Sequence, residues 1–139
     1  MAAKTIAIGN HKCGKSSLLN SLAEENLFES GPSPSTSYQI EEGTSSKNGD
    51  IYIDTPGLDN IEPEDQAGKA ISEEMNKAGE LKILFLITLD QGRINLEDVR
   101  SMKLVLESAP SIGKKYGVIF NETCQYEKYT YLRSRFLVT

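Results

Sequence analysis

The sequence predicts an α/β fold in which a mostly parallel sheet carries helices on both faces. Three observations lead to this prediction. Apolar strand segments alternate with amphipathic helical segments, as they do in a parallel sheet. The strand Thr5–Ile8 leads directly into a glycine-containing loop and a helix. The most apolar run, Ile83–Ile87, is far too short to span a membrane and is typical of a buried strand. The 139 residues suit one hydrophobic core, so we expect one domain over residues 1–139.

The first third of the chain predicts a strand, a helix and a loop. Thr5–Ile8 is the strand, and the amphipathic segment from about Ser16 to Glu25 is the helix. Small residues and two prolines fill Ser30–Ser37, which excludes a helix there and predicts a mobile loop.

The middle of the chain predicts a hairpin followed by a helix. Tyr38–Glu42 and Ile51–Asp54 are strand-like and flank Asn48-Gly49, a pair that favours positive φ and a tight turn. From Pro63 to Gly79, apolar residues recur at helical spacing.

The last third predicts a central strand, a helix and shorter strands. Leu81–Leu89 is the central strand, and Asn95 with Asp98 marks a helix start. The helical stripe that follows ends at Pro110, and Tyr116–Phe120 is the next buried strand.

One motif predicts phosphate binding. The residues Gly9-Asn10-His11-Lys12-Cys13-Gly14-Lys15-Ser16 match the pattern GxxxxGK[ST] at every fixed position, between a strand and a helix. The two glycines let successive N–H groups and the helix N-terminus, with Ser17 in its first turn, point at one anion. Lys15 is expected to reach the β- and γ-phosphates, and the Ser16 hydroxyl to bind Mg²⁺. The fold expected is therefore a three-layer P-loop NTPase fold of the Ras-like type.

A second segment completes the predicted metal-nucleotide site. Asp54-Thr55-Pro56-Gly57 follows the strand Ile51–Asp54, where the Asp54 carboxylate can hold a magnesium-bound water. Gly57 leaves room for a backbone N–H to approach the γ-phosphate. In the loop between the two segments, Thr36, with Ser35 as its alternative, is the expected third magnesium ligand when the γ-phosphate is present.

The net charge argues against nucleic acid as a partner, and the cysteine content is typical of a protein in a reducing compartment. Fifteen basic and twenty acidic residues give a net charge of −5, which offers no footprint for nucleic acid. Two cysteines, Cys13 and Cys124, are too few for a disulfide framework. With no signal peptide or membrane segment in the sequence, we expect a cytoplasmic protein.

Four segments resemble GTPases, two of them a broad class and two of them one family within it. Gly9–Asn20, with its continuation Ser-Ser-Leu-Leu-Asn after the lysine, and Asp54-Thr55-Pro56-Gly57-Leu58 look like translation-factor-related GTPases. The stretch Leu86–Asn95, followed by Glu97-Asp98, resembles the family-specific box of the avirulence-induced-gene GTPases, called GIMAP proteins in vertebrates, and Phe28-Glu29-Ser30 is also similar. The resemblance implies GTP and GDP as ligands, Mg²⁺ as cofactor, and nucleotide-dependent self-association as a homodimer or a heterodimer with a family member.

Two departures from that pattern affect the expected chemistry. Leu58 stands where the Ras-like template has a glutamine that orients water, so intrinsic hydrolysis should be slow. After the strand Tyr116–Phe120, Asn121 is the candidate for contact with the base, but the usual aspartate is missing, and guanine preference is implied only by the resemblance. Glu122 and Glu127 are possible substitutes or plain surface charges.

The hypotheses that remain differ in what the fold does. The first is a slow GTPase switch, with hydrolysis assisted by a residue from a second copy. The second is a hydrolysis-deficient scaffold or interaction module, and an ATP-using enzyme is a weaker third. His11 and Arg93 are either exposed loop residues or parts of an association surface. Because only Arg135–Val138 is a candidate last strand, the chain is also expected to be a shortened relative or a fragment.

Overall fold

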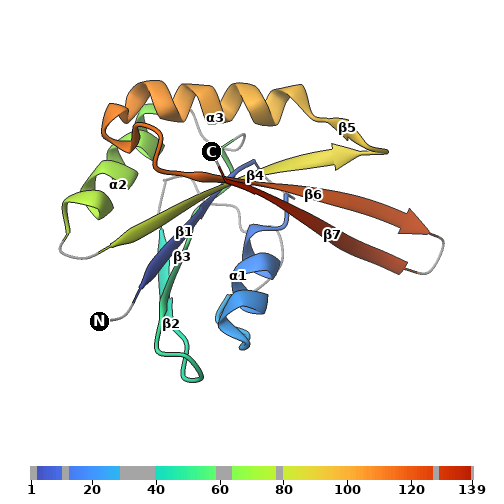
Figure 1. The fold of residues 1–139 in the computed structure, drawn as a ribbon, viewed down its shortest axis with the longest axis horizontal. Coiled ribbons are helices and arrows are strands. Elements are labelled where there is room, and N and C mark those ends of the chain that lie inside the picture. Colours follow the sequence, from blue (N-terminus) through green and yellow to red (C-terminus); the bar gives the residue numbers. More distant parts are fainter. Residues whose placement is uncertain are drawn as a thin grey trace.

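The fold is a seven-stranded sheet flanked by helices, seen here in a computed structural model (Figure 1). The structure describes residues 3–10, 13–28, 40–58, 64–77, 80–126 and 129–138. Within these ranges it describes only the backbone of residues 64–67, 122–126 and 129–138. The strands are β1 (Lys4–Ile8), β2 (Glu41–Thr44), β3 (Ile51–Asp54), β4 (Leu81–Asp90), β5 (Arg93–Ile94), β6 (Gly117–Tyr126) and β7 (Tyr129–Val138). The helices are α1 (Lys15–Ala23), α2 (Glu64–Asn76), α3 (Leu96–Ser108) and the 3₁₀ turn η2 (Pro110–Ile112).

The strand order is β2-β3-β1-β4-β6-β7, with β5 paired to β4 outside this path. The four inner strands, β3, β1, β4 and β6, run parallel, while β2 and β7 are antiparallel at the two edges. Parallel strands end at the same side of the sheet, which places the loops after β1, β3 and β4 together. The predicted α/β class with a mostly parallel sheet is confirmed.

Side chains of the strands alternate between two separate cores. Ile6, Ile53 and Phe85 face a cluster that includes Ile71 of α2 and Val105 of α3. Their neighbours face the other way, into a cluster with α1 residues; this second cluster comprises Ala7, Cys13, Leu19, Ala23, Phe28, Tyr52, Leu86 and Ile119. Figure 1 shows the result, with α2 and α3 over one face of the sheet and α1 over the other. The prediction of helices on both faces is confirmed.

Two tight turns use positive φ angles as hairpins require. Between β2 and β3, Gly49 has φ 76°, as the Asn48-Gly49 pair predicts. Between β4 and β5, both Gln91 (φ 51°) and Gly92 (φ 79°) are left-handed. The second turn directs β5 back toward the start of α3.

Helix boundaries agree closely with the sequence-based expectations. Asn95 is the N-cap of α3, with its side chain accepting from the N–H groups of Glu97 and Asp98. Helix α1 ends at Ala23, two residues earlier than expected, because Glu24 adopts a left-handed conformation (φ 56°) and its N–H bonds back to Asn20 and Ser21. The predicted loop Ser30–Ser37 lies outside the described residues.

The carboxyl-terminal part differs from expectation. The strand predicted to end at Phe120 continues to Tyr126, so Asn121 and its successors are strand residues rather than a loop. The last strand spans Tyr129–Val138 instead of four residues. The reason is the antiparallel pairing of β6 with β7 along their whole length, which supplies backbone partners that the apolar pattern alone does not reveal. Within the described part of the chain, no helix has the length and apolar character needed to cross a membrane.

Candidate phosphate-binding site

The loop after β1 turns sharply because of two glycines. A Cβ on Gly9 would lie 2.7 Å from Cys13 Sγ, closer than real Cβ atoms approach, and 3.0 Å from the Leu86 carbonyl oxygen, which is also a tight contact. Gly14 has φ 91° and precedes α1, a conformation that L side chains rarely adopt. The backbone can therefore fold over the end of the sheet as the motif predicts.

Lys15 lies over this loop rather than in solvent. Its ammonium Nζ donates to the carbonyl oxygens of Gly9 at 3.1 Å and Asn10 at 2.9 Å, and the residue is only 7% exposed. The Cys13 sulfur is 3.6 Å away. Burial raises the pKa of the Cys13 thiol, against the opposing effect of the Lys15 charge. The loop thus holds one buried cation, which favours an anion beside it.

Helix α1 begins without a side-chain cap. Gly14 is its N-cap residue and has no side chain to accept a hydrogen bond from the first turn. The N–H of Leu18 already bonds to the Gly14 carbonyl, while the N–H groups of the three preceding residues have no acceptor within the helix. An uncapped N-terminus beside a lysine matches what a phosphate group needs.

Two of the three predicted metal-binding residues, Ser16 at the start of α1 and Asp54 at the end of β3, are in direct contact. The Ser16 hydroxyl donates a hydrogen bond to Asp54 Oδ2, although the two residues are 38 positions apart. The N–H of Thr55 donates to the other carboxylate oxygen at 3.0 Å, and the Thr55 hydroxyl anchors this turn to the Ala7 carbonyl at 2.7 Å. Burial raises the pKa of the Asp54 carboxyl, with the Ser16 hydrogen bond, the Lys15 charge and the Thr55 N–H opposing it.

The segment after Asp54 is fixed by its backbone and by a core residue. The Leu58 N–H donates to the Gly9 carbonyl at 3.1 Å, which attaches this segment to the phosphate loop. The Leu58 side chain is 5% exposed and packs in the core beneath α2 and α3. Gly57 is also buried. Leucine at position 58 therefore has a packing role and carries no group that can hold water.

Asn121 reaches the site from β6. It is 1% exposed, and its Nδ2 donates to the Cys13 carbonyl at 2.8 Å, 108 residues away in the sequence. In the strand it pairs with Thr88 of β4. The side chain predicted to meet the base thus supports the phosphate loop. The carboxylates of Glu122 and Glu127 lie outside the described side chains.

A buried contact that the sequence did not predict joins the loop to α3. Asn10 Nδ2 donates to Asp98 Oδ1 at 2.8 Å, and the Thr88 N–H donates to Asp98 Oδ2 at 2.7 Å. The pattern at the start of α3 identified Asp98 only as part of a helix start. Its carboxylate instead points away from the cap and accepts from two other elements.

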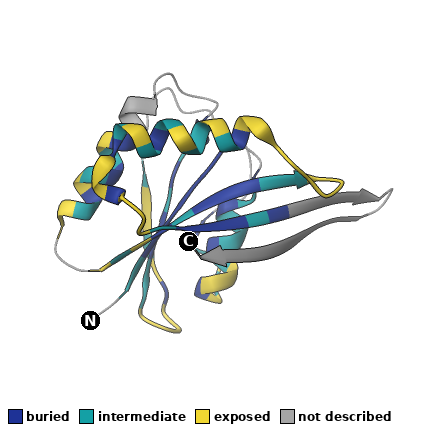
Figure 2. Ribbon diagram, turned by 45° about the horizontal axis from the view of Figure 1, so that its top comes forward, coloured by how far each residue is buried: buried dark blue, intermediate teal, exposed yellow. Residues whose placement is uncertain are grey.

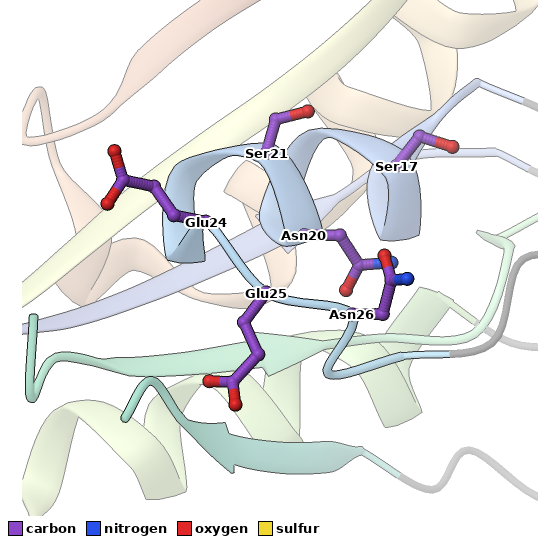
Figure 3. Close-up of a pocket in the computed structure, with 6 residues that line it drawn as sticks. All are labelled: Ser17, Asn20, Ser21, Glu24, Glu25 and Asn26. Atoms are coloured by element: carbon purple, nitrogen blue, oxygen red, sulfur yellow. The ribbon is translucent and has the colours of Figure 1, made fainter. Parts of the chain in front are cut away.

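One more predicted residue, Ser17, is described by the structure. His11, Lys12 and Thr36 lie outside the described residues. The Ser17 side chain lines an open polar hollow of about 480 Å³ along the surface of α1 (Figure 3). There Asn20 accepts from the N–H groups of Leu27 and Phe28, both at 2.9 Å. The Asn20 side chain thereby holds the chain that follows α1, and the described residues that line the hollow include no group of three that could bind a metal.

Among the described residues, no group of three or more His, Cys, Asp or Glu side chains could hold a metal ion by itself. A Ser16 hydroxyl and an Asp54 carboxylate offer two oxygen ligands, too few for a resident ion. They suit Mg²⁺ that arrives with phosphates, because this ion keeps waters and takes only one or two protein ligands.

The loop, its lysine, the serine-aspartate pair and the parallel sheet define a P-loop nucleotide-binding domain. The family model described as 50S ribosome-binding GTPase matches residues 4–122, from β1 into β6. The chain therefore belongs to this GTPase family, and it is a GTP-binding GTPase domain. No curated protein sequence matches it.

Two solved structures of GTPases are similar to this chain. Toc33 from Arabidopsis thaliana, in complex with GDP and Mg²⁺, is 14% identical, with a TM-score of 0.43 over 88% of this chain and 71% of that chain. A septin GTPase domain from Chlamydomonas reinhardtii is 14% identical, with a TM-score of 0.36 over 86% of this chain and 51% of the other.

Proposed function

We propose that this chain is a slow GTPase switch whose nucleotide state controls self-association. The main support for the proposal is the hydrogen bond between Ser16 and Asp54, which forms beside the buried Lys15. These groups come from separate elements, yet they supply the cation, the hydroxyl and the carboxylate that a magnesium-triphosphate complex requires. Residues 1–139 would form one domain of this kind, acting in the cytoplasm.

Ser16 and Asp54 would hold Mg²⁺, Ser16 directly and Asp54 through water, with Thr36 as the proposed third ligand. The bound ion would neutralise charge on the phosphate oxygens. The Ser16 hydroxyl already points at the Asp54 carboxylate, so both oxygens face the same small space. Lys15 would exchange its contacts with loop carbonyls for the β- and γ-phosphates. The uncapped N–H groups of α1 and the backbone at Gly57 would donate the remaining hydrogen bonds to the phosphates.

Hydrolysis should be slow because no described side chain is placed to orient the attacking water. Leu58 follows Gly57, and its side chain is buried in the core. A missing water-positioning group costs several orders of magnitude in rate, as the large effects of added groups in other GTPases indicate. A second copy of the chain would then have to supply the missing group, with His11 as the candidate from the sequence.

The proposed association surface is the exposed segment 93–97, which includes Arg93, Ile94 and Leu96. Ile94 is 49% exposed and Leu96 is 78% exposed, high values for large apolar side chains. The segment follows β4 at the side of the sheet that carries the phosphate loop, and Figure 2 shows it as an exposed stretch leading into α3. It corresponds to the box that resembles the avirulence-induced-gene GTPases, and we propose membership of that subfamily.

Binding is the first test of this proposal. The purified chain is titrated with fluorescent analogues of GTP, GDP and ATP, with and without magnesium. We expect binding of the guanine nucleotides, tightened by magnesium for the triphosphate. Indifference to all three nucleotides would refute the proposal.

Turnover at several protein concentrations tests self-association. If a second copy completes the site, the rate of GTP hydrolysis rises with the square of protein concentration while the dimer is sparse. Leu96→Ser should restore a linear dependence, with the GTP affinity of the dilute, monomeric protein unchanged. Lys103→Ser, on the exposed side of α3, is the matched control and should keep the square dependence. A linear dependence in the parent chain would exclude activation by a second copy.

A hydrolysis-deficient scaffold is the second candidate, and one observation favours it. Beyond Asn121 the chain continues as β6 instead of turning into a base-binding loop. A chain of this class would bind nucleotide without turnover at any protein concentration. The turnover measurement above therefore separates the two candidates.

A further inference from the structure

One buried carboxylate ties three elements together beside the phosphate loop. Asp98, in the first turn of α3, is 5% exposed. Its Oδ1 accepts from Asn10 Nδ2 at 2.8 Å, and its Oδ2 accepts from the Thr88 N–H of β4 at 2.7 Å. Each oxygen thus holds a different element, and α3 cannot shift without breaking one of these hydrogen bonds.

The Asp98 contact fixes the orientation of the Asn10 side chain. Asn10 is 7% exposed, and its Oδ1 has no hydrogen-bond partner among the described residues. The amide is therefore oriented by the one hydrogen bond that Nδ2 gives to Asp98. The carbonyl of the same residue accepts from Lys15 Nζ at 2.9 Å, so the position of Asn10 sets the position of the lysine.

The same junction reaches the exposed segment 93–97. Thr88 uses both backbone groups there, because its N–H bonds to Asp98 while its carbonyl accepts from the Asn95 N–H at 3.0 Å. Asn95 caps α3 and lies between the exposed side chains of Ile94 and Leu96. One continuous set of hydrogen bonds therefore runs from Lys15 to the segment proposed for self-association.

We propose that Asp98 is a positioning residue that holds Asn10 and Lys15 in the arrangement that fits the phosphates, and that couples this arrangement to segment 93–97. The inference deepens the proposed nucleotide-dependent switch and rests on it. Nucleotide binding would stabilise the segment through Asp98. By thermodynamic reciprocity, a partner that holds the segment would raise nucleotide affinity by the same factor.

The first test uses the nucleotide-free protein. Asp98→Ala removes both oxygen acceptors, so neither Asn10 Nδ2 nor the Thr88 N–H keeps its partner. Glu107→Ala is the matched control, because it removes an exposed carboxylate from the same helix, outside segment 93–97. Hydrogen exchange should be about tenfold faster at residues 9–16 in Asp98→Ala and unchanged in Glu107→Ala. Equal exchange in this loop for Asp98→Ala and the parent chain would overturn the inference.

The second test measures nucleotide affinity in a double-mutant cycle. Asp98→Ala and Asn10→Ala should each weaken GDP binding about tenfold, and the double variant should be no weaker than either single one. Global unfolding is measured alongside, because a purely structural role would lower stability while leaving the affinity of the folded fraction unchanged. Fully additive losses, or losses in stability alone, would refute the positioning role.

The third test follows the coupling itself. In the parent chain, GDP should slow hydrogen exchange in residues 93–97, and Asp98→Ala should abolish this protection even at saturating GDP. Persistent protection in the variant would refute the coupling. If the parent chain binds no nucleotide, the proposed function fails, and the exchange measurement on the nucleotide-free loop still decides whether Asp98 positions it.

Discussion

The candidate site has two ends: a phosphate end with Lys15, Ser16 and Asp54, and a base end at β6, where Asn121 is the residue predicted to meet the base. The two ends differ in how many of their side chains are held in place by hydrogen bonds. At the phosphate end, Lys15, Ser16 and Asp54 are each held by hydrogen bonds to other elements. At the base end, Asn121 donates back to the phosphate loop, and β6 runs on into a hairpin with β7. We therefore expect the phosphate end to contribute most of the nucleotide affinity, while the described residues offer little to select the base.

Of the variants considered, Lys15→Ala should reduce triphosphate affinity the most. The variant loses the buried cation Lys15, so triphosphate affinity should fall by about a hundredfold or more, because charge-assisted hydrogen bonds are the strongest kind. Isothermal titration with a non-hydrolysable GTP analogue measures the change. Lys114→Ala, which removes an exposed lysine before β6, is the control and should bind like the parent chain. An affinity within a few fold of the parent would show that the loop does not receive the phosphates.

Ser16→Ala should remove the magnesium dependence of triphosphate binding. With the hydroxyl gone, one direct ligand of the ion is lost, and the gain in affinity that magnesium gives should fall about tenfold. The comparison is made with and without a chelator. Ser21→Ala, on an exposed position of the same helix, should keep the full magnesium effect. An unchanged effect in Ser16→Ala would remove this residue from the metal site.

Asn121→Ala tests whether this side chain serves the phosphate end or the base end of the site. If its main role is to hold the Cys13 carbonyl, the variant should lose about tenfold in affinity for GDP and for the inosine nucleotide, which lacks the exocyclic amine. The ratio of the two affinities should then stay constant. A loss confined to GDP would instead assign Asn121 to contact with the exocyclic amine of guanine.

Local patterns predicted the parts of the molecule whose causes are local. The strand Thr5–Ile8, the Asn48-Gly49 turn and the Asn95 cap follow from apolar periodicity and turn chemistry, and the structure confirms them. The pairing of Ser16 with Asp54 also followed from the sequence, because parallel strands bring their carboxyl ends together.

The features that sequence reasoning missed depend on contacts between distant residues. Asp98 sits in a helix-start pattern, and nothing local reveals that its carboxylate meets Asn10, 88 positions away. The length of β6 is set by pairing with β7 rather than by its own composition. Leu58 was recognised as unable to orient water, but its place in the core beneath α2 and α3 required the fold.

The smallest expected effect concerns pH and the Asp54 carboxyl. Burial raises its pKa above the ordinary value of 3.8, so the folded state binds this proton more tightly than the unfolded state. The free energy of unfolding then rises as pH falls through the raised pKa, and the penalty for the buried charge is fully present above it. Asp54→Asn keeps an oxygen that can accept from Ser16 but carries no charge. It should therefore melt a few degrees higher than the parent chain at neutral pH, without nucleotide or metal.

The difference between the two proteins should shrink as pH falls, because the parent carboxyl becomes protonated. Denaturant unfolding from about pH 8 down to about pH 5 measures it. Asp90→Asn, at an exposed position at the end of β4, corrects for the loss of one charge. A difference that grows toward acid would reverse the sign assigned to Asp54. It would mean that the folded protein stabilises the carboxylate even without a metal ion, as a phosphate-binding end with surplus positive charge would do.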